Sequence, residues 1–507
     1  MDKLHTIKIA AASIMVMLLI GFFTSLAAPP PPEIGQHKYN ILFIAVDDLR
    51  PEIGSYGADH MHTPNLDELA NRGMLFRNAY CQQSVCAPSR NSIMTGMRPD
   101  ALGIYDLRTF FRSKNPDLVT LPQYFKQYGY ISECVGKIYH LGHGNKDDAL
   151  SWSVPKHSHH ERLKKFTNVS RGDTVNLQSD FPGINGKRLP YYRSHAPENQ
   201  MTDAVISDIA IERIKALKDT SFFVAVGFIK PHLPFVAPKK YWDLYDPADI
   251  KIPKRESPDE MPELALHSFG ELRKYHNIPS ANEEKYLDDE TTINLIHGYR
   301  ACVSMIDAQV GKLLNTLDEL GISDETIIIL WGDHGWKLGE YGGWCKHTNF
   351  ELDTRVPLFI SAPQFSRGME TGSIAELVDI YPTLCELAGL EIPDHLEGQS
   401  LVKILENSQA VVNEVAISQY PRGKNLGYDH KKEIMGYSIF DGTYRFTRWQ
   451  HYENPEIIVA RELYDHQNNR VAESNLAGRK KYEKMVKQYD KKLDTELKKY
   501  KIKKASP

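Results

Sequence analysis

Cys86 begins the most distinctive short motif of the chain, Cys86-Ala-Pro-Ser-Arg90. Pro88 and Ser89 are typical of the first turn of a helix, so the motif predicts a helix that begins near the cysteine. The free N–H groups at a helix start favour an anion, and this placement suits a nucleophile that attacks an anionic ester. The alternative is a buried, unreactive cysteine beside an ordinary turn.

Carboxylates and one imidazole form a second group of candidate residues. Asp47-Asp48 and Asp333-His334 each come directly after an apolar run. Three carboxylates with one imidazole suit a hard divalent cation better than a thiolate zinc site. A single aspartate pair after a strand is also typical of a helix cap or a turn. The same arrangement at a second strand end favours the metal interpretation.

Basic side chains complete the set that an anionic ester requires. Cleavage of such an ester needs a cation, fixed positive donors and an acid for the leaving alcohol. Taken singly, each basic residue is more often a surface charge or a structural histidine. Their joint placement favours the functional interpretation of Arg90, Lys137, His140, His232 and Lys346.

Apolar, β-rich runs precede most of these residues and must position them. The runs are residues 40–46, 129–135, 222–228 and 326–331, and helical patterns cover 65–72, 202–217 and 295–320. Continuous apolar strands alternating with helices predict a large, mostly parallel sheet covered on both faces. Ligands of such sheets bind beyond the carboxyl ends of the strands, so we expect one site at that edge.

A second unit is expected after about residue 385. Strand-like pieces at 414–418, 434–440 and 443–449 indicate an antiparallel α+β subdomain. The Lys-rich end has apolar residues at helical spacing, which predicts a packed amphipathic helix rather than a polyanion-binding arm. We therefore expect a signal peptide over 1–28, a catalytic α/β domain over 36–385 and a C-terminal subdomain over 386–507.

The N-terminus has the pattern of an export signal. Lys3 and Lys8 precede an apolar run from Ile9 to about Phe23, and Ser25-Leu-Ala27 resembles a cleavage site. An uncleaved membrane anchor is the alternative. We expect an exported protein, periplasmic or secreted, without stable membrane insertion after cleavage. Export would permit three disulfides among the six cysteines, and one fewer if Cys86 is chemically consumed.

The composition excludes a wholly disordered, a collagen-like and an entirely membrane-embedded protein. The 507 residues are 41% hydrophobic and 25% charged, as in globular proteins. A net charge of −4 provides no global basic field, so nucleic acid is not an expected partner.

The motif at Cys86 resembles the C-x-P-S-R signature of the sulfatase family. Within that family the chain is most similar to the iduronate 2-sulfatase group and its bacterial relatives, over almost the whole predicted mature chain. The similar segments are Val46-Asp-Asp-Leu-Arg-Pro51, Gly136-Lys-Ile-Tyr-His140, Lys230-Pro-His-Leu-Pro-Phe235, Asp333-His-Gly-Trp-Lys-Leu-Gly-Glu340, Ser418-Gln-Tyr-Pro-Arg422 and Ile434-Met-Gly-Tyr-Ser-Ile439.

This resemblance implies an alkaline-phosphatase-like sulfatase fold and oxidation of Cys86 to formylglycine by a formylglycine-generating or anaerobic sulfatase-maturating enzyme. It implies one calcium ion held by Asp47, Asp48, residue 86, Asp333 and His334. Arg90 and Lys137 would stabilise the formylglycine hydrate and the sulfate, and His140 would help to expel sulfate. His232 and Lys346 would contact the bridging oxygen, with one of them acting as general acid.

The implied substrate is a sulfated oligosaccharide or polysaccharide, with exo-acting removal of a 2-O-sulfate from a terminal uronic acid. Departures from the iduronate 2-sulfatase pattern at Leu141-Gly-His-Gly144, Tyr341, Cys345 and His347 leave the sugar open. The alternatives are another sulfated sugar of a marine algal polysaccharide, such as ulvan or carrageenan, or an aryl sulfate. A phosphatase, a phosphonate hydrolase and a non-catalytic glycan-binding protein fit the residues less well.

Overall fold

A central sheet organises the computed structural model, which describes residues 38–163, 183–184, 187–423 and 433–503. The predicted signal peptide lies outside the described residues. The sheet order is β12-β2-β13-β9-β1-β7-β3, and β14 also pairs with β2. Its strands are β1 (Asn40–Val46), β2 (Met74–Tyr80), β3 (Ile131–Gly136), β7 (Phe222–Phe228), β9 (Thr326–Gly332), β12 (Arg355–Val356), β13 (Leu358–Ser361) and β14 (Met369–Glu376).

Four parallel strands, β9, β1, β7 and β3, form the part of the sheet that the apolar runs predicted. β1 pairs in parallel with β9 on one side and with β7 on the other, and β3 pairs in parallel with β7. Every residue of β1, β7 and β9 is buried. Strands with both faces covered have no solvated side, which explains why their sequences are continuously apolar rather than alternating.

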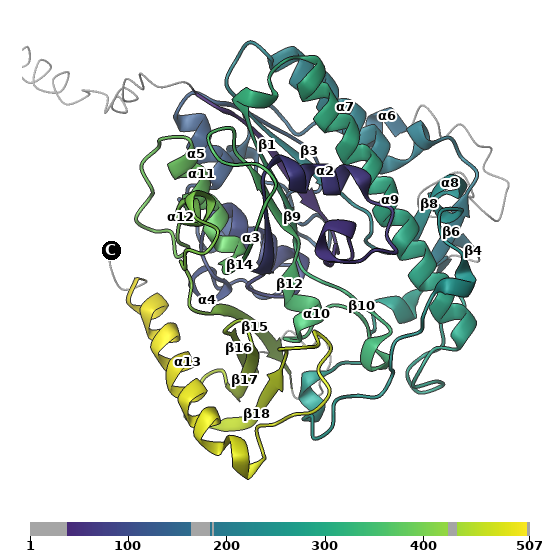
Figure 1. The fold of residues 1–507 in the computed structure, drawn as a ribbon, viewed down its shortest axis with the longest axis vertical. Helices are drawn as coiled ribbons and strands as arrows, with labels where there is room; N and C mark the ends of the chain where they lie inside the picture. Colours follow the sequence, from purple (N-terminus) through teal and green to yellow (C-terminus); the bar gives the residue numbers. More distant parts are fainter. Residues whose placement is uncertain (1–37, 164–182, 185–186, 424–432, 504–507) are drawn as a thin grey trace, which may run out of the picture. The chain divides into compact units, whose positions relative to one another are not determined.

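Helices cover the two faces of this sheet (Figure 1). One group contains α2 (Pro64–Arg72), α7 (Thr202–Leu217) and α9 (Asp289–Glu319), and the other contains α3 (Cys86–Thr95), α5 (Leu121–Gln127) and α11 (Ile380–Leu387). α7 packs on β3 and β7 and against α9. The fold class expected from the sequence is therefore confirmed.

The part of the sheet beyond β9 combines parallel and antiparallel strand pairs. β13 runs antiparallel to both β9 and β2, and β12 runs antiparallel to β2, whereas β14 pairs in parallel with β2. None of these four strands was expected from the sequence, because they are short or carry charged and polar residues such as Arg77 and Glu370.

A second, antiparallel sheet has the order β15-β16-β17-β18. Its strands are β15 (Ala416–Arg422), β16 (Ile434–Phe440), β17 (Tyr444–His451) and β18 (Ile458–Asp465). Val486, Tyr489 and Leu493 of α13 (Glu483–Lys503) are buried in one cluster with Ile439 and Phe446 of this sheet. The Lys-rich terminal helix is therefore packed, as its spacing predicted.

Shorter elements complete the chain. They are α4 (Pro99–Leu102), α6 (His159–Leu163), α8 (Lys239–Trp242), α10 (Glu351–Thr354), α12 (Val402–Glu406), β4 (Gly183–Ile184), β5 (Lys187–Arg188), β6 (Tyr191–Ser194), β8 (Phe235–Pro238), β10 (Lys337–Leu338) and β11 (Trp344–Cys345). The domain boundary expected between 385 and 386 stays a prediction, and it falls inside α11.

Disulfides between the cysteines and a membrane-spanning helix were also considered from the sequence. All six cysteines are buried free thiols in the described chain, so none of the permitted disulfides is present. Within the described residues, no helix combines the length and apolar character needed to cross a bilayer.

Candidate active site

Two neighbouring strands bring the carboxylates together. Val46, the last residue of β1, pairs with Gly332, the last residue of β9. The residues that follow, Asp47-Asp48 and Asp333-His334, therefore leave the sheet side by side. This is the convergence that parallel strands predict at their carboxyl ends.

Lys137 reaches the same edge because two glycines let the backbone approach closely. Gly136 pairs with Gly227 at the ends of β3 and β7, and the Lys137 N–H donates to Gly227 O at 2.7 Å. A Cβ on Gly227 would lie 2.2 Å from the Lys137 carbonyl carbon, and one on Gly136 would lie 2.0 Å from Gly227 O. Gly136 also has φ +79°, which favours glycine. Any side chain at either position would displace Lys137.

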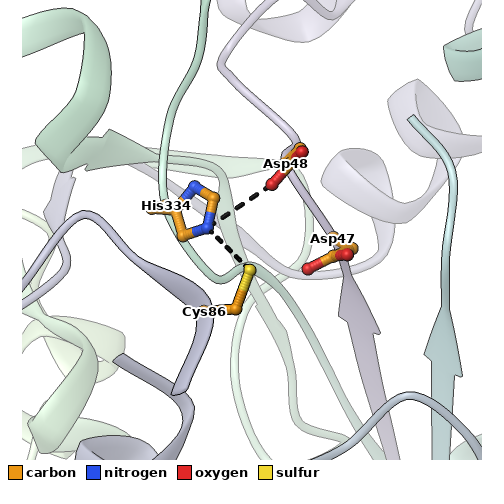
Figure 2. A group of neighbouring side chains, drawn as sticks. All are labelled: Asp47, Asp48, Cys86 and His334. Carbon is orange, nitrogen blue, oxygen red and sulfur yellow. Dashed lines mark hydrogen bonds and ion pairs between the residues drawn. The ribbon is translucent and has the colours of Figure 1, made fainter. Parts of the chain in front are cut away.

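Cys86 is the first residue of α3, as the motif predicted. Its Sγ lies 3.3 Å from His334 Nε2 and 3.7 Å from Lys137 Nζ. In Figure 2, dashed lines join one nitrogen of the His334 ring to both Asp48 and Cys86, and Asp47 lies on the same side of the ring. Ligand atoms of Asp47, Asp48, Cys86 and His334 all lie within 4.8 Å of one another, which is close enough for one metal ion to contact all four.

Asp333, the fifth expected metal ligand, lies beside this cluster and is engaged by protein groups. Its Oδ1 accepts the backbone N–H of Asp48 at 3.0 Å and that of His334 at 3.1 Å. Its Oδ2 accepts a hydrogen bond from Arg90 Nε at 2.8 Å and lies 3.6 Å from His334 Nε2. Asp333 therefore ties the ends of β1 and β9 together.

Asp48 has a left-handed backbone conformation with φ 60°. Such a conformation costs energy in a non-glycine residue and persists only when its surroundings hold it. Here the Asp48 N–H donates to Asp333, and Tyr299 of α9 donates through its hydroxyl to Asp48 O at 2.9 Å. The side chain is thereby aimed at Cys86 and His334.

Arg90 is fully buried and joins three strand ends. Its Nη2 donates to Asp47 Oδ1 at 2.9 Å, its Nε to Asp333 Oδ2 at 2.8 Å, and its Nη1 to Ile138 O at 3.0 Å and to Lys137 O. All three nitrogens thus donate to protein groups. Arg90 organises the carboxylates in this geometry, a function that the sequence did not indicate.

The acidic groups of the cluster have pKa values that are shifted in different directions. Burial would raise the pKa of Asp47, but Lys137 and Arg90 hold it well below its ordinary value. Burial raises the pKa of Asp48 well above its ordinary value, and the charge of Asp47 adds to the effect although Lys346 opposes it. Burial and then Asp47 also raise the pKa of the Cys86 thiol, so the helix start does not produce a thiolate here.

A hard divalent cation fits this cluster. Two buried carboxylates and an imidazole converge, and burial raises the pKa of Asp48 well above its ordinary value, a shift that a bound cation would offset. Such ions take oxygen ligands, whereas Cys86 offers sulfur. The donor set suits a hard ion best when residue 86 carries an oxygen.

His232 and Lys346 also lie beside Asp48. Asp203 of α7 accepts the backbone N–H of Ile229 at 2.6 Å and so positions the loop after β7. His232 Nδ1 donates to Leu233 O at 2.7 Å, and its Nε2 lies 4.0 Å from Asp48 Oδ2. Lys346 Nζ lies 3.1 Å from Asp48 Oδ1 and 4.7 Å from the centre of the Trp336 ring.

Burial would lower the pKa of Lys346, but Asp48 and Glu271 raise it well above its ordinary value. Burial, and then the charge of Lys346, lowers the pKa of His232 to about 3. In this geometry Lys346 is the charged member of the pair, and His232 is neutral with its proton on Nδ1.

Glu271 is a member of the site that sequence reasoning missed. Its Oε1 lies 3.0 Å from Lys346 Nζ and 3.4 Å from His232 Nε2. Asp48, His232 and Glu271 form a second group with metal-ligand geometry, but the Lys346 ammonium already contacts both carboxylates. Glu271 lies in a loop without apolar periodicity, and no pattern around it could have identified it.

His140 lies at the edge of the site, beyond Lys137. Its Nε2 is 3.3 Å from Nδ1 of His143, and the two rings are stacked. Burial, and then the charge of Lys137, lowers the pKa of His140 to about 2, so the ring is neutral. The structure thus places the expected side chains at one sheet edge, with Asp333 and Arg90 engaged by protein groups.

The fold and the site define an α/β enzyme with a metal-type cluster built around a cysteine. The family model described as "Sulfatase" matches residues 39–390, and one described as "N-sulphoglucosamine sulphohydrolase, C-terminal" matches residues 339–499. The first of these covers more than half of the chain and includes Asp47, Cys86 and Asp333.

Curated relatives agree with the family model. The chain is 33% identical to iduronate 2-sulfatase of Mus musculus, over 88% of this chain and 92% of that protein. It is also 33% identical to a sulfatase of Formosa agariphila, over 81% of this chain and 80% of the relative. The chain belongs to the sulfatase family and is a sulfuric ester hydrolase.

Structural comparison supports the fold. The phosphonate monoester hydrolase SpPMH from Silicibacter pomeroyi superposes with a TM-score of 0.74 at 23% identity, over 91% of this chain and 96% of that one. The expected alkaline-phosphatase-like sulfatase fold is confirmed. At this identity the likeness concerns the fold alone.

Proposed function

We propose that this sulfatase removes a 2-O-sulfate from a terminal uronic acid of a sulfated glycan, acting from the chain end. The similarity to iduronate 2-sulfatase, at 33% identity over most of both chains, supports this substrate. The chemistry rests on one observation, the convergence of Asp47, Asp48, Cys86 and His334 within 4.8 Å. Export to the periplasm or the medium, where such glycans are found, belongs to the same proposal.

Residue 86 would carry formylglycine. The Cys86 thiol is buried and its pKa is raised, so an unmodified cysteine is a poor nucleophile here. An oxygen at residue 86 also matches the ligand preference of a hard cation. The modified side chain would supply an oxygen nucleophile at the start of α3, and a maturation enzyme would be the partner that produces it.

Asp47, Asp48, His334 and residue 86 would hold calcium, with Asp333 fixing their orientation. The ion would supply a Lewis acid that withdraws charge from the sulfate oxygens. Lys137, with a side chain 13% exposed, lies between the cluster and solvent and would bind a sulfate oxygen. Arg90 would hold Asp47 and Asp333 in place.

The leaving alcohol would lie on the side of His232 and Lys346. The Lys346 ammonium is the charged group there, and it would donate a hydrogen bond or a proton to the bridging oxygen as the S–O bond breaks. His232, with no proton on Nε2, would lie beside that oxygen and accept a hydrogen bond from the alcohol once Lys346 has protonated it, and His140 would act when sulfate is released.

Sulfate release from a defined 2-O-sulfated uronate disaccharide tests the reaction. We expect turnover by the mature chain and none by Cys86→Ala. Cys385→Ala is the matched control, because Cys385 is a buried thiol of α11 outside the site. Full activity of Cys86→Ala would refute the nucleophile assignment, and turnover only of algal or aryl sulfates would refute the substrate.

Mass spectrometry tests the modification separately. The tryptic peptide from Asn78 to Arg90 contains both Cys81 and Cys86. We expect an aldehyde in place of the thiol at residue 86 and an unmodified thiol at Cys81, which serves as the internal control. Two intact thiols in protein from a host with maturation enzymes would refute the formylglycine proposal.

A further inference from the structure

Glu271 occupies an unusual position at the leaving-group side of the site. One of its oxygens, Oε1, accepts a hydrogen bond from Lys346 Nζ at 3.0 Å and lies 3.4 Å from His232 Nε2. The Asp47, Asp48 and Asp333 side chains are fully buried, whereas the Glu271 side chain is 22% exposed. Glu271 is therefore a carboxylate that an incoming substrate can reach.

The second oxygen of Glu271 is available to a ligand. No described residue donates a hydrogen bond to Oε2, and a carboxylate oxygen has two lone pairs. Beside it, the Lys346 ammonium is a donor, and the Nδ1 proton of His232 is taken by Leu233 O. Oε2 thus provides an acceptor directly beside the groups proposed to contact the bridging oxygen.

We infer that Glu271 determines substrate specificity by accepting a hydrogen bond from a hydroxyl next to the sulfated carbon. This inference rests on the proposed function. In a terminal 2-O-sulfated uronate, C1 carries the glycosidic bond, so the neighbouring free hydroxyl is that on C3. A second sulfate at C3 would place an anion against Glu271 and be rejected. The substrate class is therefore a terminal 2-O-sulfated uronate with an unsubstituted C3 hydroxyl.

A substrate-variant cycle tests the contact. Sulfate release is measured for wild type and Glu271→Ala on the 2-O-sulfated disaccharide and on its 3-deoxy analogue, which have the same ester and similar leaving groups. For wild type we expect kcat/KM to be about 10- to 100-fold lower on the 3-deoxy analogue, as for loss of a hydrogen bond to a charged group. For Glu271→Ala we expect less than about a 3-fold difference between the substrates, because the contact is already absent.

Two further variants separate recognition from structure. Glu271→Gln keeps an acceptor without the charge, and we expect it to discriminate between the substrates by an intermediate factor. It also provides the comparison if Glu271→Ala gives no turnover. Glu284→Gln is the matched control, since Glu284 is exposed on the same segment, and it should discriminate as wild type does.

Equal discrimination by wild type and Glu271→Ala would overturn the inference and leave the proposed function intact, because it would mean that Glu271 acts only through Lys346 and His232. Equal kcat/KM values of wild type on the two disaccharides would also overturn the inference and leave the proposed function intact. Absence of sulfate release by wild type from both disaccharides would overturn the proposed function, and this inference with it.

Discussion

Arg90 and Asp333 form a fully buried ion pair, with the Arg90 Nε donating to Asp333 Oδ2 at 2.8 Å although the residues are 243 positions apart. The pair joins the middle of α3 to the residue that follows β9. Because Asp333 also accepts the Asp48 N–H, a change at Arg90 reaches the whole cluster.

Arg90→Gln should unfold more easily than wild type. Removing one partner of a buried ion pair leaves uncompensated charge and costs about 3–5 kcal/mol. Urea unfolding measures the change in the free energy of unfolding, with Arg367→Gln as the control, because Arg367 and Asp324 form an exposed pair worth less than about 1 kcal/mol. Equal losses of unfolding free energy in the two variants would contradict the role that we assign to Arg90, which is to hold Asp47 and Asp333 in place.

Chelation of divalent cations should lower the melting temperature of the mature protein, since an ion that binds only the folded state stabilises it. In Asp48→Asn the chelator should have little effect, and the bound calcium measured by elemental analysis should fall. Asp219→Asn, an exposed substitution, should keep both properties of wild type. Full calcium content in Asp48→Asn would exclude Asp48 as a ligand.

Lys346→Ala should affect esters of poor leaving groups most. We expect kcat/KM on the sugar sulfate to fall by about 10²- to 10⁴-fold, the usual contribution of an acid that assists a leaving group. On 4-nitrophenyl sulfate the loss should be much smaller, because nitrophenolate leaves without a proton. Lys239→Ala provides an exposed control. Similar losses on both esters would indicate that Lys346 binds sulfate instead.

His159 should make the protein sensitive to acid. Burial, and then the charge of His160, lowers its pKa from 6.5 to about 3, and neither ring nitrogen has a hydrogen-bond partner among the described residues. Between these two pKa values the unfolded chain binds a proton that the folded chain does not. Stability is therefore fully present above pH 6.5 and falls as the pH decreases, by about 2 kcal/mol at pH 5 from this residue alone.

His159→Phe should remove that part of the pH dependence. Urea unfolding at pH 7.5 and pH 5 measures it, and His451→Phe, at the exposed last residue of β17, should behave as wild type. An unchanged difference between the two pH values in His159→Phe would rule His159 out as the source.

Much of the fold was predictable because buried strands are continuously apolar. The expected bounds of β1 and β7 agree with the structure, and those of β3 and β9 differ by two residues or fewer. The sequence did not indicate β2 and β14, where charged residues interrupt the pattern, or β18, whose first four residues are exposed or only partly buried. Pairing with a neighbouring strand, rather than local propensity, forms these strands.

By itself, the sequence identified the class of reaction, through the resemblance of its motifs to the sulfatase family. Cys86, the aspartates at two strand ends and the basic residues near them were all visible, because strand ends and helix starts leave local patterns. The tertiary structure decided how they act together. It placed Arg90 between Asp47 and Asp333, and it brought Glu271 to Lys346 and His232. Contacts between residues so far apart depend on how the loops pack, and no local pattern encodes them.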